Sequence, residues 1–480
     1  MGQVLLINAS FPRDGLKIYS KLSPPMGSLT IAAQLEETGY GVRLIDPQIE
    51  DNYKDKIEIE LKDKPIFVGM TVFMGKNILN AVEISKYIKR RSPNTPIVFG
   101  GPLATSSPEI CFDNAPVDYI VMGVGEYTSV ELARTLENGE DATSLPHIST
   151  REGRNIKDGY FFNQDIDQLK FPRLDLWEEG VRRMGKIPIM TSRGCPRNCA
   201  FCYNNTFIGR KKWFGRSGEN VLEEMDYWAE HFRKDKFYFI DDNFLVQSKR
   251  ACYILEKTIE KKYKINQILG SLYDFTPEVL NCITEDVHHV GFSIESASPK
   301  IQKLISKVLS LERAMNLFVF LTEKGIDMIT TNFMFGFPEE TDEDVRANIE
   351  MAVKIREVNK NIRSQPRIYS PQPGDDILSK LEYFNEFVFS IEELSTIDRA
   401  PNRSMQLSGE IRPWMSKEDL EFYLDLVLVW FYHFDYVVRD DQDIDVEGIL
   451  KRNKRLAKLF KNVPTVEEES VKLSKFRTAS

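Results

Sequence analysis

The sequence predicts an α/β protein in which two β/α domains follow one another and a mainly helical region comes last. Three observations lead to this fold class. Short apolar runs alternate with helical patterns up to about residue 140, the alternation resumes with new content at residue 187, and it ends near residue 378. The chain has 480 residues, too many for one ordinary hydrophobic core, so several domains are expected.

The N-terminal domain is predicted over residues 1–140. Helical patterns, among them residues 26–39 and 77–91, lie between five runs rich in Val and Ile. Such runs are typical of a parallel sheet buried on both faces, so we expect a doubly wound, Rossmann-like fold that binds ligands at the carboxyl ends of its strands. The predicted strands are VLLINAS (4–10), VRLID (42–46), IFVGMTVF (66–73), PIVFGG (96–101) and DYIVMG (118–123).

Residues 141–186 are predicted to be a connector with one short strand at GYFFN. Residues 187–378 are predicted to form a partial (β/α)6 barrel, because six strand patterns alternate there with helical ones. In the fifth unit Thr341 is the predicted N-cap of a helix, and Asp344 lies in its first turn. The six predicted strands are IPIMTSRG, KFYFIDD, INQILGSLY, HVGFSIES, MITTNFMFGFP and IRSQPRIYSPQP.

Residues 379–480 are predicted to be a helical C-terminal domain and tail. The apolar stretch LDLVLVWFYHFDYVV contains His433 and Asp435 and is too short and too polar to span a bilayer, so it is predicted to be a buried helix. Residues 449–461 read as a basic amphipathic helix with a solvated face. Aromatic residues at helical spacings are predicted to be core instead of a substrate site: Trp414, Tyr423, Trp430, Tyr432 and Tyr436.

Composition and charge exclude several functional classes. A net charge of −9 argues against broad electrostatic binding to nucleic acid or to an anionic membrane, so we expect neither as a partner. The first residues lack a basic segment followed by a long apolar run, so no signal peptide is expected. Six unevenly placed cysteines do not form a secreted disulfide framework, which predicts a reducing, cytoplasmic location.

Three cysteines, Cys195, Cys199 and Cys202, lie within the short stretch SRGCPRNCAFCYNN. A structural zinc site usually has four ligands in paired spacings, and no fourth cysteine or histidine lies nearby. A disulfide is disfavoured by the expected compartment and by the odd number. An iron–sulfur cluster with three protein ligands leaves one iron open, and an open coordination position is what catalysis needs.

This C-x3-C-x2-C pattern, followed by the aromatic Tyr203 just past the first strand of a six-unit β/α barrel, resembles that of the radical S-adenosylmethionine (radical SAM) enzymes. The resemblance implies that the three cysteines hold a [4Fe–4S] cluster whose fourth iron binds SAM. It implies that one electron, from a donor such as flavodoxin or ferredoxin, cleaves SAM to methionine and a 5′-deoxyadenosyl radical. This radical then removes a hydrogen atom from the substrate.

The same resemblance implies that residues at the ends of the barrel strands bind SAM. FIDDNF would meet the SAM amino group, GFSIES the ribose and the methionine carboxylate, and the glycine of GFP the adenine. The alternative is that acidic residues at strand ends cap the next helix and that Gly-Phe-Pro turns the chain. The implied SAM-binding residues are Tyr203, Asp241, Asp242, Asn243, Ser293, Glu295 and Gly336.

The N-terminal domain resembles that of the cobalamin-binding radical SAM subfamily, and the resemblance covers residues 1–375. The stretches that carry it are PPMGSLTIAAQLEETGY, VGMTVFMGK, VFGGPLATSSPE and MGVGEYT, whose glycines allow the backbone to approach a wide corrin. The implied cobalamin contacts are Pro25, Met26, Gly27, Thr71, Val72, Phe73, Gly100, Gly101, Gly123, Gly125 and Glu126.

One departure from that subfamily is plain. The D-x-H-x-x-G motif, whose histidine ligates cobalt in many cobalamin enzymes, is missing, and the corresponding loop SFPRDGLKIYSKLSPPMG contains no histidine. Bound cobalamin would therefore have a lower cobalt face that is unligated or weakly held. The alternative is a cobalamin-like domain that has lost its cofactor and only supports the barrel. Dinucleotide binding by GVGEYT is disfavoured, because the run is a partial motif on the fifth strand.

The remaining cysteines, Cys111, Cys252 and Cys282, lie in helical patterns and are predicted to be buried thiols. Only one of them lies in the first domain, whereas tRNA methylthiotransferases need three there, which disfavours that activity. His288 and His289 open the fourth barrel strand at its amino end, and we expect them to be structural.

The sequence thus predicts a cobalamin-dependent radical SAM enzyme, most simply a methyltransferase acting on an unactivated carbon of a small-molecule or natural-product substrate. The resemblance implies two uses of SAM, one as the methyl source for cobalamin and one as the source of the radical. The first alternative keeps both cofactors but performs a ring rearrangement, a cyclisation or a sulfur insertion. The second is a non-catalytic iron–sulfur or cobalamin carrier.

Overall fold

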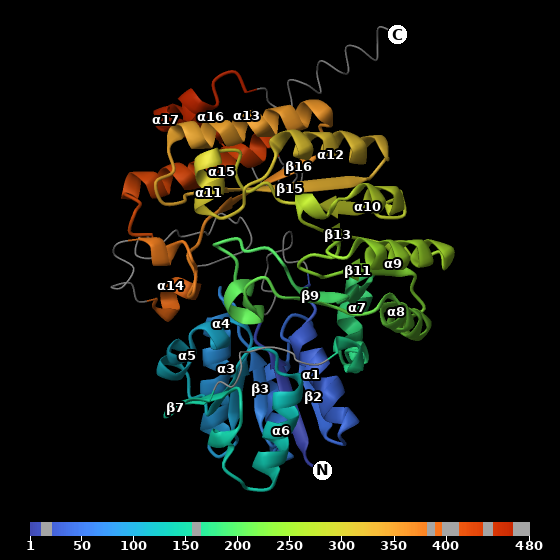
Figure 1. Cartoon of the computed structure of the whole chain (residues 1–480). Helices are drawn as coiled ribbons and strands as arrows, with labels where there is room; N and C mark the ends of the chain where they lie inside the picture. The colour runs from blue at the N-terminus through green and yellow to red at the C-terminus, as the bar shows by residue number, and fades with distance from the viewer. Residues whose placement is uncertain (11–21, 156–164, 382–388, 396–411, 435–444, 464–480) are drawn as a thin grey trace. The chain divides into compact units, whose positions relative to one another are not determined.

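The chain divides into two compact units. The computed structural model describes residues 1–10, 22–155, 165–381, 389–395, 412–434 and 445–463 (Figure 1). The first unit comprises Met1–Asn243, Glu260–Tyr263 and Gln372–Ala400, and the second comprises Phe244–Ile259, Lys264–Pro371 and Pro401–Ser480. The first unit therefore contains the predicted N-terminal domain, the connector and the first two strands of the predicted barrel. The domain boundaries proposed from the sequence remain predictions.

The first unit is built on a seven-stranded sheet with the strand order β2-β1-β3-β4-β5-β6-β7. The first five strands pair in parallel, as the five apolar runs predict, and β6 and β7 add an antiparallel edge within the predicted connector. The connector strand predicted at residues 159–163 lies outside the described residues. The strands are β1 (Gln3–Asn8), β2 (Gly41–Ile45), β3 (Val68–Thr71), β4 (Ile97–Gly100), β5 (Tyr119–Val121), β6 (Ile148–Thr150) and β7 (Gly153–Asn155).

Helices cover both faces of this sheet, which confirms the doubly wound fold. Figure 1 shows α1 and α6 on one side of the strands and α3, α4 and α5 on the other, and α1 and α6 share one apolar core with the strands. Helix α3 has the predicted bounds, whereas α2 and α6 are found only in the structure. The helices are α1 (Met26–Glu37), α2 (Tyr53–Lys62), α3 (Asn77–Arg91), α4 (Pro102–Ser106), α5 (Pro108–Asn114) and α6 (Glu126–Glu137).

The remainder of the first unit carries the first two strands of the predicted barrel. The single strand predicted over 187–194 is two strands: β8 pairs in parallel with β11, whereas β9 pairs antiparallel with β10. The elements are η1 (Ala142–Ser144), η2 (Ile166–Gln168), η3 (Leu174–Trp177), α7 (Glu178–Met184), β8 (Ile187–Ile189), β9 (Ser192–Gly194), the π-helix η4 (Asn205–Gly209), β10 (Trp213–Gly215), α8 (Gly218–Phe232), β11 (Lys236–Phe239), η6 (Leu378–Lys380) and α14 (Ile391–Ser395).

The second unit contains a parallel sheet with the order β13-β14-β15-β16 and the helices around it. The last four predicted barrel strands thus form in the predicted order. The elements are α9 (Ser248–Glu260), β12 (Lys264–Ile265), β13 (Ile268–Leu269), η5 (Leu272–Asp274), α10 (Pro277–Cys282), β14 (His289–Gly291), α11 (Pro299–Leu304), α12 (Leu311–Glu323), β15 (Met328–Phe335), α13 (Asp342–Val358), β16 (Arg363–Ile368), α15 (Lys417–Phe434), α16 (Val446–Arg452) and α17 (Lys454–Leu459).

Two local predictions in the second unit are confirmed. Thr341 caps α13: its hydroxyl accepts a hydrogen bond from the Asp344 backbone N–H, and the Asp344 carboxylate accepts one from the Thr341 N–H. Helix α15 is buried along the predicted apolar stretch, and Trp430 at its centre donates from Nε1 to the Ser364 carbonyl at 2.8 Å. Tyr436, predicted to be core, lies outside the described residues.

Two other predictions are wrong. Cys252 in α9 and Cys282 in α10 form a disulfide, and their Cα atoms lie 5.4 Å apart. Of the three cysteines predicted to be buried thiols, only Cys111 is one. The basic stretch 449–461 is two short helices, because the Asn453 side chain caps the second one. Its Arg455 pairs with Asp342 and Asp419.

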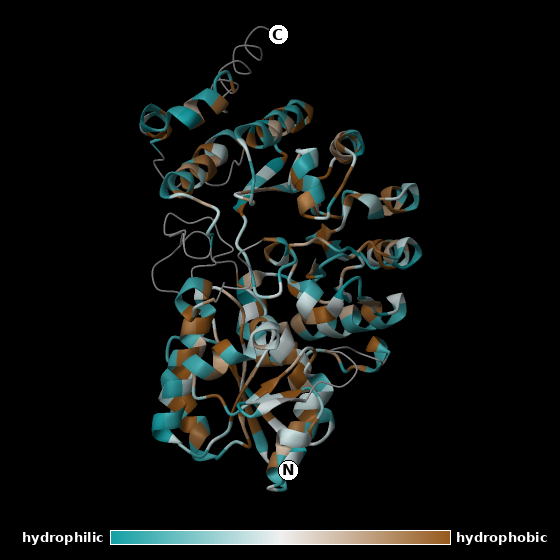
Figure 2. Ribbon diagram, turned by 60° about the vertical axis from the view of Figure 1, so that its left-hand side comes forward, coloured by the Kyte–Doolittle hydropathy of each residue, from teal (hydrophilic) through white to brown (hydrophobic). Residues whose placement is uncertain are grey.

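In both units the hydropathy of the residues varies regularly along the helices. Figure 2 shows bands of apolar and hydrophilic residues alternating along the helices, which is typical of helices with one buried and one exposed face. None of the helices within the described ranges is long and apolar enough to cross a membrane.

Candidate functional site

The three cysteines lie on the loop between β9 and β10, and all three are partly exposed. The loop is shaped by its own backbone: the Cys202 N–H donates to the Cys199 carbonyl and the Asn205 N–H to the Cys202 carbonyl, both at 3.1 Å. The π-helix η4 follows directly. A tight turn therefore presents the three sulfur atoms from one short segment, as the spacing predicts. We call residues 195–209 the cysteine loop.

Two glycines set the position of the cysteine loop. Gly194 has φ +79°, and a Cβ atom there would lie 2.4 Å from the Lys212 carbonyl oxygen, so only glycine lets β10 pass this close to the loop. Gly374 has φ +81°, and a Cβ there would lie 2.2 Å from Thr206 Cγ2. Beside it the Asp376 N–H donates to the Ala200 carbonyl at 3.0 Å. Residues 374–376 thus brace the cysteine loop, a contact that the sequence did not indicate.

The surroundings of the sulfur atoms fit an iron–sulfur cluster. Asn243 donates from Nδ2 toward Cys195 Sγ at 3.7 Å, and the Asn204 backbone hydrogen-bonds to Cys202. Burial, together with the charges of Cys199 and Asp242, raises the pKa of the Cys202 thiol to about 12. A bound metal supplies positive charge that stabilises the thiolate form of such a thiol, and hydrogen bonds to sulfur are common around iron–sulfur clusters.

A single metal ion has no equivalent site in the described part of the chain, where no three His, Cys, Asp or Glu side chains converge on one point. In a [4Fe–4S] cluster the ligands are distributed over different irons.

The SAM residues predicted in the first unit differ in their surroundings. Asp241 is buried and accepts hydrogen bonds from Thr191 and Ser192, so it fixes the chain between β8 and β9 instead of capping the next helix. Asp242 is exposed and accepts hydrogen bonds from the Tyr203 hydroxyl and from the Gly194 N–H, each at 3.1 Å. Of the two carboxylates, Asp242 is the one held at a position that a ligand reaches.

The SAM residues predicted in the second unit follow β14 and β15, which are parallel neighbours. Ser293 Oγ accepts a hydrogen bond from Asn332 Nδ2 at 2.8 Å. Glu295 is buried with φ +65° and forms an ion pair with Lys307 Nζ at 3.0 Å. Both side chains therefore already have protein partners, and the sequence did not indicate those partners.

Gly336 ends β15 in a left-handed conformation with φ +78°. Its N–H donates to Glu340 Oε2 at 2.6 Å, and its carbonyl accepts from Trp414 Nε1 at 3.1 Å. Burial raises the pKa of the Glu340 carboxyl to about 8, although this side chain also hydrogen-bonds to Tyr423. Trp414, predicted to be core, therefore contacts a predicted SAM residue.

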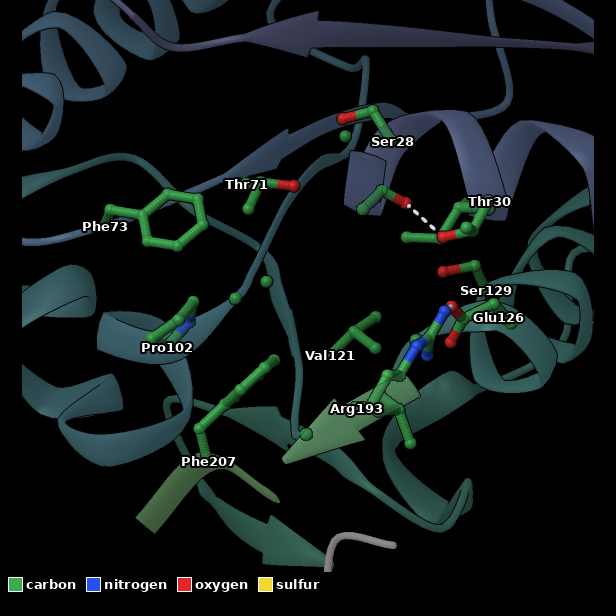
Figure 3. A pocket seen from close by; sticks show the side chains of 18 of the residues that line it. Ser28, Thr30, Thr71, Phe73, Pro102, Val121, Glu126, Ser129, Arg193 and Phe207 are labelled. Carbon is green, nitrogen blue, oxygen red and sulfur yellow. Dashed lines mark hydrogen bonds and ion pairs between the residues drawn. The ribbon is translucent and has the colours of Figure 1, made fainter. Parts of the chain in front are cut away.

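A cavity of about 290 Å³ lies within the first unit, at the carboxyl ends of β3, β4 and β5 (Figure 3). Eight of the predicted cobalamin contacts line it: Gly27, Thr71, Phe73, Gly100, Gly101, Gly123, Gly125 and Glu126. Of the other three, Met26 and Val72 are buried in the core and Pro25 precedes α1, and none of them lines the cavity. The opposite wall comes from β9, the cysteine loop and the end of β11, and it includes Arg193, Tyr203, Asn204, Phe207 and Asp242.

One ion pair crosses the cavity wall. Arg193 Nη2 lies 2.6 Å from Glu126 Oε1, and the two side chains are 9% and 4% exposed (Figure 3). Burial by itself would raise the pKa of Glu126, but the charge of Arg193 outweighs it and holds this pKa below its usual value. The pair ties the start of α6 to β9, directly before the cysteine loop. The sequence pointed to Glu126 but not to Arg193.

Comparisons with known proteins agree with this geometry. The Radical SAM superfamily model matches residues 189–352, and the B12 binding domain model matches residues 19–133. An uncharacterized methyltransferase of Pyrococcus horikoshii is 28% identical over 88% of this chain and 93% of its own length. Cytidylyl-2-hydroxyethylphosphonate methyltransferase of Streptomyces wedmorensis is 23% identical over 73% of this chain and 77% of its own.

A solved structure shares the fold. The radical SAM methyltransferase TsrM from Kitasatospora setae, with tryptophan substrate and a SAM analogue bound, has a TM-score of 0.66 and 19% identity over 78% of this chain and 75% of its own.

Proposed function

We propose that this chain, which belongs to the radical SAM enzymes that carry a B12-binding domain, is a methyltransferase acting on an unactivated carbon of a small-molecule substrate. Its cofactors are a [4Fe–4S] cluster, SAM and cobalamin. The observation that carries the proposal is the cavity of the first unit, because strand-end glycines and residues of the cysteine loop line the same space. A methyl donor and a radical source must both reach one substrate atom, and a shared cavity supplies that proximity.

The bound groups would supply the chemistry: a 5′-deoxyadenosyl radical from SAM at the cluster, and a methyl group from cobalamin. In our proposal Cys195, Cys199 and Cys202 hold the cluster, and the Asn243 amide donates to one of its sulfur ligands. Asp242, which is fixed by its two hydrogen bonds, would accept an N–H from the SAM amino group.

Part of the cavity lining is apolar. Leu6, Phe67, Val98 and Phe207 lie there together with Phe73, and in our proposal this part keeps water away from a radical formed beside it. This arrangement suits attack on a carbon that has no activating group.

The strand ends of the second unit are proposed to bind the rest of SAM. Ser293 and Glu295 would face the ribose and the methionine carboxylate, and Gly336 would face the adenine. Lys307, 3.0 Å from Glu295, supplies the positive charge that lets a carboxylate approach this acidic side chain. The one electron for each SAM cleavage would come from a small redox protein such as flavodoxin or ferredoxin.

The test begins with protein purified without oxygen from cells supplied with cobalamin. We expect iron and cobalt in stoichiometric amounts and the absorbance of a [4Fe–4S] cluster. The protein is then incubated with a reductant, with SAM carrying a deuterated methyl group and with fractionated small-molecule extracts. Methyl transfer predicts that S-adenosylhomocysteine and 5′-deoxyadenosine both form and that the label enters a product.

Other outcomes contradict the proposal in distinct ways. Formation of 5′-deoxyadenosine without S-adenosylhomocysteine, with an unlabelled product, would mean rearrangement, cyclisation or sulfur insertion. Iron without cobalt, even after reconstitution with cobalamin, would mean that the first unit is only a scaffold. SAM left intact by the reduced protein, with Cys199→Ala behaving identically, would mean a carrier.

A further inference from the structure

Asp376 holds the cysteine loop at two places. Its backbone N–H donates to the carbonyl of Ala200, which lies between Cys199 and Cys202, at 3.0 Å. Its two carboxylate oxygens accept hydrogen bonds from Nη1 and Nη2 of Arg210, the residue that directly follows the loop and its π-helix η4. One residue from a distant part of the sequence thus fixes both the middle and the end of the cysteine loop.

The segment that carries Asp376 is itself firmly seated. It follows the last strand, β16, along the chain and belongs to the first unit. Ile377 and Leu378, directly after Asp376, are buried. The Ile377 N–H donates to Asp375 Oδ1 at 2.7 Å and closes a turn. The Asp376 carboxylate is therefore a fixed point of the structure and not a charge on a freely moving surface segment.

The cysteine loop needs support from outside, because the hydrogen bonds within it fix its shape but not its position. The Cys202 N–H and the Asn205 side-chain amide both donate to the Cys199 carbonyl, at 3.1 and 2.9 Å. An iron–sulfur cluster is rigid, and three thiolates must reach its irons at the same time. Groups that hold metal ligands in place from behind therefore affect how well the metal is retained.

We propose that Asp376 is a positioning residue for the iron–sulfur cluster, which keeps Cys199 and Cys202 in place through Ala200 and Arg210. The proposal rests on the proposed function, because it takes the three cysteines to be the cluster ligands. Of the two contacts, the ion pair is the one that a side-chain substitution removes. The Arg210 side chain is half exposed and that of Asp376 is 18% exposed, and two-point pairing is the geometry in which such a pair contributes most.

Removal of the Asp376 carboxylate leaves the backbone bond to Ala200 intact and releases only the end of the loop. The cluster should therefore still assemble, but it should be lost more easily. This expectation differs from that for a cluster ligand, whose removal prevents assembly.

The experiment measures how fast the Fe(II) chelator bathophenanthroline disulfonate removes iron from reduced, anaerobically prepared, cluster-loaded full-length protein. In Asp376→Ala and in Arg210→Ala we expect iron loss about three- to fivefold faster than in the wild type, as loss of one well-formed, partly exposed ion pair implies. The iron content before the chelator is added should equal that of the wild type. Hydrogen exchange in residues 205–212 should also be faster in both variants.

The double variant Asp376→Ala/Arg210→Ala tests whether the two side chains act as a pair. If they do, the double variant should lose iron no faster than either single variant, because each single substitution already removes the whole interaction. Fully multiplied effects would overturn the role of the pair. Because Arg210 is half exposed, its replacement also tests the proposal should Asp376→Ala fail to fold.

Asp175→Ala is the matched control. Asp175 lies in η3 of the same unit and also pairs at two points with an arginine, since Arg173 Nε and Nη2 donate to its two oxygens at 2.9 and 2.7 Å. Its replacement should leave the rate of iron loss within about twofold of the wild type. The unfolding temperature should fall by no more than about 3 °C in the Asp376 and Asp175 variants alike. A merely structural role of Asp376 would lower this temperature without changing the rate of iron loss.

Wild-type rates of iron loss and of hydrogen exchange in Asp376→Ala and Arg210→Ala would overturn the inference and leave the proposed function standing. Equal acceleration in Asp175→Ala would overturn it as well. Failure of the wild type itself to hold iron after reconstitution would overturn the proposed function, and the inference with it.

Discussion

The carboxyl ends of the strands are built differently in the two units. In the first unit they are glycines and small or apolar residues around a cavity, such as Gly101 and Gly123. In the second unit Ser293 is bonded to Asn332 and Glu295 to Lys307. The first unit therefore offers open space between small residues at its strand ends, whereas a ligand at the second unit's strand ends must exchange these hydrogen-bond partners or add to them. The strand ends of the first unit thus provide open volume, and those of the second provide charged and hydrogen-bonded side chains.

Two glutamates at these strand ends show how the partner decides the protonation state. Both carboxyls are removed from solvent. Glu126 lies beside Arg193, which lowers its pKa, whereas Glu340 accepts hydrogen bonds from the Gly336 N–H and from Tyr423 and has its pKa raised to about 8 by burial. At Glu126 the neighbouring cation outweighs the cost of burial, whereas at Glu340 the neutral donors do not.

The largest expected effect comes from removing a proposed cluster ligand of the first unit. In Cys199→Ala we expect iron content to fall and SAM cleavage to drop below detection, because the cluster would lose one of its three proposed protein ligands. Iron analysis and 5′-deoxyadenosine formation measure this. Cys111→Ala is the control, since that thiol is buried in α5 and should leave both readouts unchanged. Full iron loading in Cys199→Ala would show that the cysteine loop does not hold the cluster.

Next comes the ion pair in the cavity wall. Glu126→Gln removes the carboxylate that faces the buried Arg193 guanidinium, so we expect a loss of about 3 kcal/mol in the free energy of unfolding. The unfolding temperature should fall accordingly. Glu131→Gln on the same helix breaks only an exposed pair with Arg134 and should cost about 0.5 kcal/mol or less. Equal losses in the two variants would mean that the cavity wall does not depend on this pair.

The ion pair between Arg193 and Glu126 makes the free energy of unfolding depend on pH. Because the folded pKa of Glu126 is lowered, its contribution to stability is complete above the usual glutamate pKa of about 4.3 and is lost as the pH falls further through the folded value. The Glu126→Gln variant should therefore lose less stability than the wild type on acidification below pH 4.

A smaller effect is expected from adding one carbon to the glycine wall of the cavity, which consists of Gly27, Gly100, Gly101, Gly123 and Gly125. Gly101 has φ +92°, and a Cβ there would lie 2.8 Å from Thr71 Cγ2 and 3.2 Å from the Val72 carbonyl. Gly101→Ala should lose about 1–2 kcal/mol of stability through backbone strain and bind cobalamin about tenfold more weakly. Gly139→Ala introduces a similar strain at φ +70° with no atom within 4 Å, so it should lose stability alone. Unchanged cobalamin affinity in Gly101→Ala would show that the glycine wall does not contact the ligand.

The last effect belongs to Glu340 and has the opposite sign with pH. Its raised folded pKa means that the folded chain holds a proton that the unfolded chain releases, so stability falls as the pH rises from about 4.3 toward 8. Glu340→Gln should remove this fall, so the free energy of unfolding of the variant should change less with pH over this range than that of the wild type. Thermal unfolding followed across pH tests it, and an identical slope in variant and wild type would show that Glu340 is ionised at neutral pH.

The sequence by itself determined the fold class, the cysteine pattern and several elements to the residue. Helix α3 and the Thr341 cap appear where the sequence places them. Apolar periodicity and capping act between residues a few positions apart, so a single segment of chain carries the whole signal.

Contacts between residues far apart in the sequence were decided by the tertiary structure alone. Arg193 faces Glu126 across 67 residues, Gly374 packs on Thr206, and Cys252 joins Cys282 instead of remaining a thiol. Contacts of this kind depend on where folded elements bring distant residues, and no local pattern in the chain encodes that placement.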